Sequence, residues 1–176
     1  IFIPNLGCPH RCVFCQQEKI TARQSRPMGR QTVTEILHTA IHSPRFDPSL
    51  KPEVAFYGGT FTGLPEEKIS ELLGAVTPYL REGFFHSIRV STRPDALQEE
   101  KLDILRRFGV STVELGAQSM DNNVLELSGR GHRAEDTVAG VHRLKAYGFR
   151  VGIQLMPGLP GGTEQGCMIT VEHVLA

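Results

Sequence analysis

The sequence predicts an α/β fold, a partial (β/α) barrel of the TIM type with parallel strands and about five to six strand–helix units. Short apolar runs alternate along the chain with segments whose apolar residues recur at helical spacing. No hairpin signal separates consecutive strands, so helices should make the crossovers and the strands should be parallel. When right-handed crossovers always lead to the next strand on the same side, a parallel sheet curls into a barrel. With too few strand–helix units the barrel stays open.

The expected strands are short, apolar and bounded by turn residues. An N-terminal run, Ile1-Phe2-Ile3, directly precedes a loop rich in cysteine. Residues 54–57 form a continuous apolar run between Pro52 and Gly58, which is typical of a strand buried on both faces. The remaining strands are expected over residues 87–92, 112–116 and 150–156.

The expected helices have recognisable ends. In the helix predicted over 31–42, Thr32 is the expected N-cap and Glu35 follows three residues later. In the helix predicted over 65–80, Pro65 suits the first turn, and Pro78 should kink or end the helix. The other helices are expected over 96–108 (closed by Gly109), over 121–127, over 134–147 (closed by Gly148) and from Thr163 onward, and the polar segment 19–30 is expected to be a loop.

Length and composition restrict the class of protein. The chain has 176 residues, enough for one domain with a sizeable core. Its 19 basic and 19 acidic residues create no net field toward nucleic acid or a membrane. No apolar run of about 18 residues and no signal peptide is visible, so we expect a cytoplasmic protein without a membrane partner. Because the chain lacks an initiator Met and closes inside an expected helix, we expect residues 1–176 to be one domain of a longer protein.

Three of the four cysteines occur together, in the spacing C-x3-C-x2-C: Cys8, Cys12 and Cys15. One short loop can direct three such thiolates at a single inorganic centre, and crowded cysteines outside the secretory route favour a metal site over disulfides. Three protein ligands leave one coordination position open, which implies chemistry on a molecule that binds there.

Two other functions stay open for the cysteine loop. The first is a non-catalytic zinc-binding module, in which His10 or another residue supplies the fourth ligand. The second keeps the fold but uses a cluster only to carry electrons. The remaining cysteine, Cys167, is expected to be an inert helix thiol, and His132 and His173 are not expected to be ligands.

Polar residues occupy the ends of the expected strands, where βα barrels place their chemistry. Side chains of a strand alternate between its faces, and a sealed barrel would hold Val, Ile and Leu inside. We therefore expect an internal ligand site, with Glu114 neutralised by Arg89 or Arg150, because an unpaired buried carboxylate is costly. Arg93 and Asp95 are expected to form a structural turn and a helix N-cap. The residues expected on the inner face are Arg89, Ser91 and Arg93, then Glu114, Gly116 and Gln118, then Gly152, Gln154 and Met156.

Together these motifs resemble those of the radical S-adenosylmethionine (SAM) superfamily. The cysteine spacing, with Phe14 before the last cysteine, is similar to the cluster loop of that superfamily, and Gly58-Gly59-Thr60 resembles its glycine motif after the second strand. The sequence is most similar to bacterial proteins that resemble the catalytic subunit of Elongator, and next to proteins that resemble the oxygen-independent coproporphyrinogen III oxidases. The segments that carry this likeness are 58–61, 92–95, 115–119, 130–132 and 156–160.

Three departures leave the substrate undefined. The Elongator-type subunits space their cysteines more widely, and residues 1–176 contain no acetyltransferase segment. Ser91 stands where the coproporphyrinogen oxidases carry a glutamate for the SAM ribose. The resemblance therefore implies a radical SAM core domain over residues 1–176 without specifying its substrate. A tRNA and a porphyrin-like molecule are the two candidates.

The resemblance implies an iron–sulfur enzyme without catalytic residues beyond the cluster. Cys8, Cys12 and Cys15 would hold three irons of a [4Fe-4S] cluster, and SAM would bind the fourth. One electron from the reduced cluster would cleave SAM, giving a 5'-deoxyadenosyl radical that abstracts hydrogen from the substrate. An external electron donor is implied as a partner.

The resemblance also implies a set of SAM-binding residues. Gly58 and Gly59 would let the backbone approach the methionine part of SAM, where Thr60 would add a contact. Arg130 would pair with the carboxylate of SAM. The residues expected around the nucleoside are Ser91, Gln118 and Gln154 for the ribose hydroxyls, and Phe2, Phe14 and Met156 for its aromatic and apolar surroundings.

Overall fold

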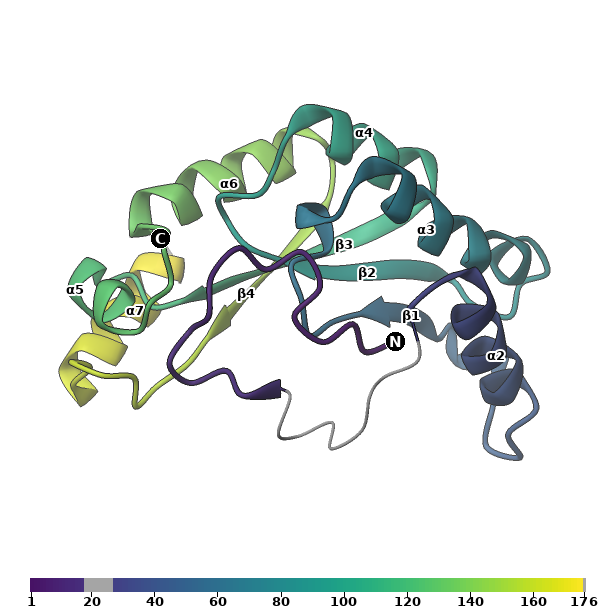
Figure 1. The fold of residues 1–176 in the computed structure, drawn as a ribbon, viewed down its shortest axis with the longest axis horizontal. Coiled ribbons are helices and arrows are strands. Elements are labelled where there is room, and N and C mark those ends of the chain that lie inside the picture. Colours follow the sequence, from purple (N-terminus) through teal and green to yellow (C-terminus); the bar gives the residue numbers. More distant parts are fainter. Residues whose placement is uncertain (18–26, 176) are drawn as a thin grey trace.

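A computed structural model describes residues 1–17 and 27–175 of the chain. Its framework is a parallel four-stranded sheet in the order β1-β2-β3-β4 (Figure 1). Each crossover therefore carries the chain to the adjacent strand, which is the topology of a barrel segment. The predicted parallel order is confirmed.

The elements alternate along the chain as the sequence predicts. The strands are β1 (Glu53–Phe56), β2 (Ser87–Thr92), β3 (Val110–Gln118) and β4 (Arg150–Leu155). The α-helices are α2 (Arg30–Ile41), α3 (Glu66–Arg81), α4 (Glu99–Arg107), α5 (Asn122–Leu127), α6 (Ala134–Ala146) and α7 (Glu164–Leu175). Two short 3-10 helices are η1 (Pro48–Leu50) and η2 (Phe61–Gly63). Among the described helices, none combines the length and the apolar character that crossing a membrane requires.

The N-terminal run lies beside β1 but does not form the full strand that the sequence predicts. Phe2 makes an isolated parallel bridge to Tyr57, and the Ile3 backbone N–H donates to the Tyr57 carbonyl at 2.8 Å. Ile3 is fully buried. Because Tyr57 directly follows β1, this short pairing brings the cysteine loop to the carboxyl end of the sheet.

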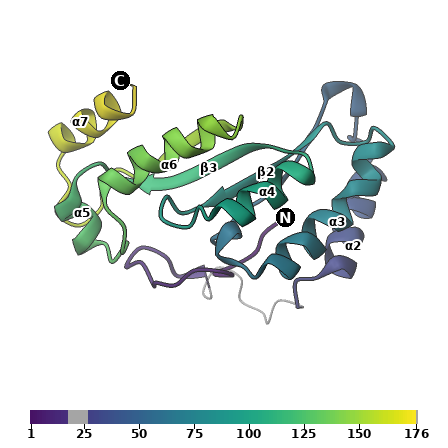
Figure 2. The ribbon, with the colours of Figure 1, turned by 90° about the horizontal axis from the view of Figure 1, so that it is seen from above.

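The hydrophobic core lies between the sheet and its helices. The helices α3, α4 and α6 run along one side of the sheet, and the N-terminal segment crosses the other side (Figure 1). The helix α6 packs against β3 and β4, and Figure 2 shows it lying along β3. The strands contribute alternate apolar side chains to this core, as a sheet covered on one face should. Fully buried core residues include Ile88, Val90, Val113, Leu115, Leu72, Leu102 and Leu144.

The prediction that Thr32 is a helix N-cap was wrong. The helix α2 has Gly29 as its N-cap, and the hydroxyl of Thr32 donates to the Pro27 carbonyl at 3.0 Å. Of the two outcomes predicted for Pro78, a kink or an end, the end does not occur, because α3 continues to Arg81. Proline leaves the carbonyl four residues earlier without its helical partner. Here that carbonyl, of Gly74, lies 3.5 Å from Nη1 of Arg30, which supplies a replacement donor.

Other boundaries moved by a few residues. The helix α4 begins at Glu99, three residues after the predicted start, because Gln98 has the extended backbone of an N-cap. Asp121 caps α5 by accepting from the backbone N–H of Asn123 and Val124. Most of the predicted loop over 19–30 lies outside the described residues.

Candidate functional site

The cysteine loop, defined here as residues 4–16, is anchored by its backbone to the segment after β1. The Thr60 N–H donates to the Leu6 carbonyl at 2.8 Å. A Cβ on Gly59 would lie 2.3 Å from the Leu6 carbonyl oxygen, and a Cβ on Gly63 would lie 2.2 Å from the Gly7 oxygen. These contacts leave no room for a side chain, so glycine is required where the two backbones meet.

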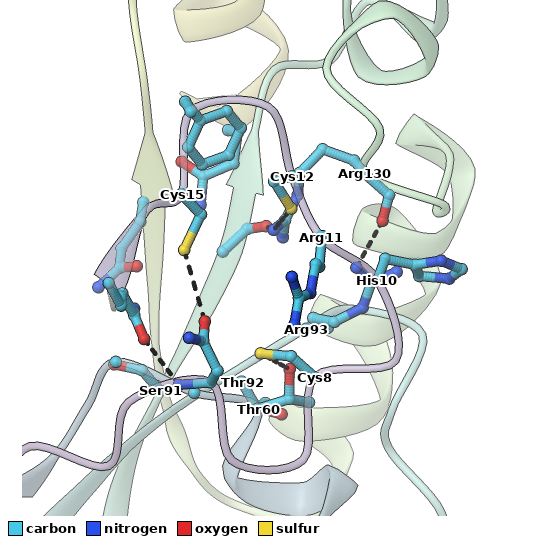
Figure 3. Close-up of a pocket in the computed structure, with 18 of the residues that line it drawn as sticks. Cys8, His10, Arg11, Cys12, Cys15, Thr60, Ser91, Thr92, Arg93 and Arg130 are labelled. Carbon is cyan, nitrogen blue, oxygen red and sulfur yellow. Dashed lines mark hydrogen bonds between the residues drawn. The ribbon is translucent and has the colours of Figure 1, made fainter. Parts of the chain in front are cut away.

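Each cysteine has a hydrogen-bond partner of its own, two of them outside the cysteine loop and one within it (Figure 3). The sulfur of Cys8 lies 3.3 Å from Oγ1 of Thr60, after β1. The sulfur of Cys12 accepts a hydrogen bond from Nη1 of Arg130 at 3.3 Å, although the two residues are 118 positions apart. The thiol of Cys15 donates to Oδ1 of Asn5 at 3.8 Å. All three cysteines are free of disulfide bonds.

The three cysteines line one cavity of about 700 Å³ at the carboxyl ends of the strands. A space of this size suits a small-molecule ligand. Burial raises the pKa of the Cys15 thiol, and the other two cysteines act in the same direction. The predicted site residues that line this cavity are Cys8, Cys12, Cys15, Phe14, Gly58, Gly59, Thr60, Ser91, Gln118, Arg130 and Gln154.

Two predicted site residues do not line this cavity. The ring of Phe2 packs against Tyr57, with 5.4 Å between ring centroids, and fills the space where a Cβ of Gly58 would sit. Met156 lines a separate cavity of about 120 Å³ beside α7. Alternation places residues on a face only within a strand, and β4 ends at Leu155, one residue before Met156.

Arg130 is a buried cation below the cysteine loop, 7% exposed. Besides Cys12, its guanidinium donates through Nη2 to the Gly116 carbonyl, at the end of β3. Within residues 1–17 and 27–175, its Nε has no hydrogen-bond partner. A buried N–H without a partner is costly, and the same guanidinium places a positive charge next to Cys12.

Arg93 and Asp95 hold Arg130 in place. The guanidinium of Arg93 donates to the Arg130 carbonyl. It also donates to both carboxylate oxygens of Asp95, at 2.9 and 2.8 Å. The predicted structural turn is therefore present, but Asp95 does not cap α4, whose N-cap is Gln98. The predicted helix began at residue 96, next to Asp95, whereas α4 begins three residues later, at Glu99.

His132 is a neutral histidine buried beside this group. It is 5% exposed, and its pKa falls to about 4 because burial disfavours the imidazolium and Arg130 and Arg93 repel it. Neither ring nitrogen has a hydrogen-bond partner in the part of the chain that the structure describes. At neutral pH the side chain therefore adds no charge to the two guanidinium groups.

The inner face of the sheet carries a connected polar network. Glu114 accepts from Nη1 of Arg89 at 2.6 Å, so the prediction that Arg89 neutralises it is confirmed. The guanidinium of Arg150 instead pairs with Glu53 at 2.8 Å. Hydrogen bonds from Ser87 and Arg89 lower the pKa of Glu53, and both carboxylates raise the pKa of Arg89.

Sequence reasoning missed Asn5 as a site residue. The side-chain oxygen of Asn5 accepts from the thiol of Cys15, and its backbone N–H donates to Oε1 of Gln17 at 2.6 Å. The backbone φ of Asn5 is 55°. Asparagine is among the few residues that tolerate this left-handed conformation, so its place just before the cysteines was an available signal.

Among the described residues, no group of three His, Cys, Asp or Glu side chains is placed to hold a single metal ion. The donor set at the cavity is three thiols, Cys8, Cys12 and Cys15. An iron–sulfur cluster takes each thiolate at a separate iron, so three thiols can serve three of its irons.

The chain belongs to the radical SAM superfamily, whose family model matches residues 2–174. Members of this superfamily are enzymes that normally use a [4Fe-4S] cluster and SAM. The resemblance seen in the motifs is thereby confirmed.

Curated relatives include both of the predicted groups. The chain is 42% identical to a tRNA uridine(34) acetyltransferase of Methanocaldococcus infernus, over 89% of this chain and 36% of that protein. It is 32% identical to the heme chaperone HemW of Bacillus subtilis, over 89% of this chain and 41% of that protein. The chain thus spans less than half the length of these two relatives.

Solved structures agree with the partial barrel. An N-terminally truncated Elp3 of M. infernus superposes with a TM-score of 0.67 at 26% identity, over 84% of this chain and 38% of that one. Coproporphyrinogen III oxidase (HemN) of Escherichia coli, described as a radical SAM enzyme, superposes with a TM-score of 0.66 at 25% identity, over 98% of this chain and 40% of that one.

Proposed function

We propose that this domain holds a [4Fe-4S] cluster on Cys8, Cys12 and Cys15 and cleaves SAM reductively. The observation that carries this proposal is one shared cavity, lined both by the three cysteines and by the polar ends of β2, β3 and β4. The cluster and SAM, when bound, would supply an electron and a radical able to abstract hydrogen from a substrate. The protein's part is to hold both groups in register and to shield them from water.

The cysteine supports fit a cluster with one iron free. The sulfurs of Cys8 and Cys12 contact Thr60 and Arg130 outside the cysteine loop, and the sulfur of Cys15 contacts Asn5 within it. The guanidinium of Arg130 donates to the sulfur of Cys12 at 3.3 Å and so fixes that sulfur at the wall of the cavity. Three cysteines leave the fourth iron for a ligand, which the adjoining cavity can admit.

The remaining cavity walls fit a zwitterionic nucleoside. Arg130 provides a positive potential for the carboxylate of SAM, although two of its N–H groups already serve Cys12 and Gly116. Ser91, Gln118 and Gln154 supply polar groups for the ribose hydroxyls. Phe2 and Met156 are left out of this proposal because neither lines the cavity.

The test is anaerobic reconstitution with iron and sulfide, followed by reduction with dithionite in the presence of SAM. We expect about four irons and four sulfides per chain and release of 5'-deoxyadenosine. Cys12→Ala should abolish both the cluster absorbance and the cleavage. Cys167→Ala is the matched control, because Cys167 lines the other cavity, and it should keep both. Cleavage that survives in Cys12→Ala, or one zinc bound in place of iron, would contradict the proposal.

For the substrate, we propose tRNA ahead of a porphyrin. The support is the higher identity to the tRNA uridine(34) acetyltransferase, 42% against 32% for the heme chaperone. We expect tRNA to accelerate 5'-deoxyadenosine release at least several-fold over SAM alone. Stimulation by coproporphyrinogen and not by tRNA would reverse this order. In the cell, an external low-potential electron donor would replace dithionite.

A further inference from the structure

We propose that Glu114 is a positioning residue that turns Ser91 and Gln154 into hydrogen-bond acceptors toward the cavity, and thereby selects a ligand with a pair of hydroxyl groups. This inference rests on the proposed function, in which that ligand is the ribose of SAM. Glu114 does not line the cavity itself, whereas Ser91 and Gln154 do.

The inference starts from one carboxylate oxygen shared by two side chains. Oε2 of Glu114 accepts from Oγ of Ser91 at 3.2 Å and from Nε2 of Gln154 at 2.9 Å. Ser91 lies on β2 and Gln154 on β4, so Glu114, on β3 between them, ties the two neighbouring strands together. Its second oxygen, Oε1, is occupied by Arg89 at 2.6 Å.

The chemistry of these groups fixes the direction of both bonds. An ionised carboxylate only accepts, and a serine hydroxyl has a single proton to donate. Ser91 therefore spends its proton on Glu114 and shows the cavity only oxygen lone pairs. The amide of Gln154 must direct one of its two N–H groups at Glu114, so its carbonyl oxygen stays free to accept from a ligand.

An acceptor pair of this kind discriminates among ligands. Two neighbouring hydroxyls of a ribose can donate to the two acceptor oxygens. The oxygens of a phosphate or carboxylate carry only lone pairs, so they could not form hydrogen bonds with these two acceptors. A ligand without one of the hydroxyls leaves an acceptor unpaired, which is the stronger source of selectivity in polar sites.

The structure also provides a matched control residue. Glu53 belongs to the same network and pairs with the same Arg89, at 2.7 Å. The side chains of Glu53 and Glu114 are equally exposed, at 21%. Glu53, however, accepts from Ser87 and from Arg150, and neither residue lines the cavity.

The experiment compares binding of SAM and of its 2'-deoxy and 3'-deoxy analogues to the reconstituted protein, by equilibrium dialysis and without turnover. We expect the wild type to prefer SAM by at least about tenfold, the value of one hydrogen bond. In Glu114→Gln the amide can donate as well as accept, so the preference should fall below about threefold. Glu53→Gln should keep the full preference.

A second variant guards against a folding defect in Glu114→Gln. Ser91→Ala keeps both partners of the Arg89–Glu114 pair and removes one of the two acceptors, so it should lose the discrimination against one of the two deoxy analogues and keep it against the other. A Glu114→Gln protein that keeps the tenfold preference, or a Glu53→Gln protein that loses it equally, overturns the positioning role alone. A reconstituted wild type that binds neither SAM nor its analogues overturns the proposed function and with it the ligand named here.

Discussion

The two faces of the same four strands have opposite characters. On the helix side, Val113 and Leu115 of β3 are fully buried among apolar side chains. On the inner side, Glu114 and Gln118 of the same strand belong to a polar network and to the cavity. Neighbouring residues of one strand therefore have different roles, apolar packing on one face and polar contacts on the other, because successive side chains point to opposite faces.

The difference indicates where stability and where ligand binding reside. Apolar burial on the helix side stabilises the fold in proportion to the area removed from water. The partly exposed ion pairs of the inner face contribute little to stability, since solvent screens them. Substitutions on the helix side should therefore change the free energy of unfolding, and those on the inner face should change ligand or iron binding.

The largest effect on stability is expected on the helix side. Leu115→Ala removes a fully buried side chain at the centre of the core and should lower the free energy of unfolding by about 2–5 kcal/mol. Urea denaturation measures this change. Ile153→Ala, on the partly exposed strand β4, is the control and should cost less. Equal losses at the two positions would mean that the core is not centred where burial places it.

A pH-dependent effect follows from His132, which is buried near Arg130 and Arg93. Its pKa is about 4 in the folded state, against 6.5 for an unperturbed histidine, so the unfolded chain takes up the proton first as the pH falls. This contribution to stability is present above pH 6.5 and is lost between pH 6.5 and pH 4, by at most about 3 kcal/mol.

His132→Leu should therefore flatten the fall of unfolding free energy between pH 7 and pH 4, measured with urea. The carboxylate of Glu53 also titrates toward the acid end, but it does so in both proteins and cancels in the difference. His142→Leu, on the exposed side of α6, is the control and should follow the wild-type curve. A His132→Leu curve parallel to the wild type would contradict the depressed pKa.

The next effect tests the contact between the cysteine loop and the sheet. In Gly59→Ala the new Cβ would press on the Leu6 carbonyl from 2.3 Å, so the loop must move, at a cost of about 1–3 kcal/mol. Iron bound after reconstitution should fall to less than half of the wild-type amount. Gly83→Ala has a strained φ of 78° but nothing within 4 Å, so it should lose stability by about 1–2 kcal/mol and keep its iron.

Much of the fold was predictable because local patterns agree with the tertiary structure. Buried strands such as 87–92 and helices with clear apolar stripes appear where the sequence predicts them. The order of the sheet followed from the helical crossovers. The capping role of Thr32 failed because that residue has an alternative partner in Pro27, which local pattern alone does not reveal.

The sequence predicted which residues belong to the site better than it predicted how those residues contact one another. Alternation placed Glu114, Ser91 and Gln154 on one face, and hydrogen bonds now join them. Alternation failed for Met156, because it lies beyond the end of β4. The close packing at Gly59 depends on a loop from elsewhere in the chain, so no local pattern could predict it.

The smallest effect on stability, and the sharpest test of the two faces, is expected at Gln118. This residue lines the cavity with a φ of 71°, where the β3–β4 register shifts, and its carbonyl accepts from the Met156 N–H at 3.0 Å. Gln118→Gly relieves the backbone strain but makes the unfolded chain more flexible, so the free energy of unfolding should change by less than about 1 kcal/mol. Affinity for SAM should nevertheless fall several-fold, as measured by equilibrium dialysis.

Gln118→Ala removes the same amide but keeps the strain, so it should match Gln118→Gly in affinity and be less stable. A loss of more than about 2 kcal/mol in Gln118→Gly would mean that this inner-face residue supports the fold itself, and the division between the two faces would not hold at the end of β3.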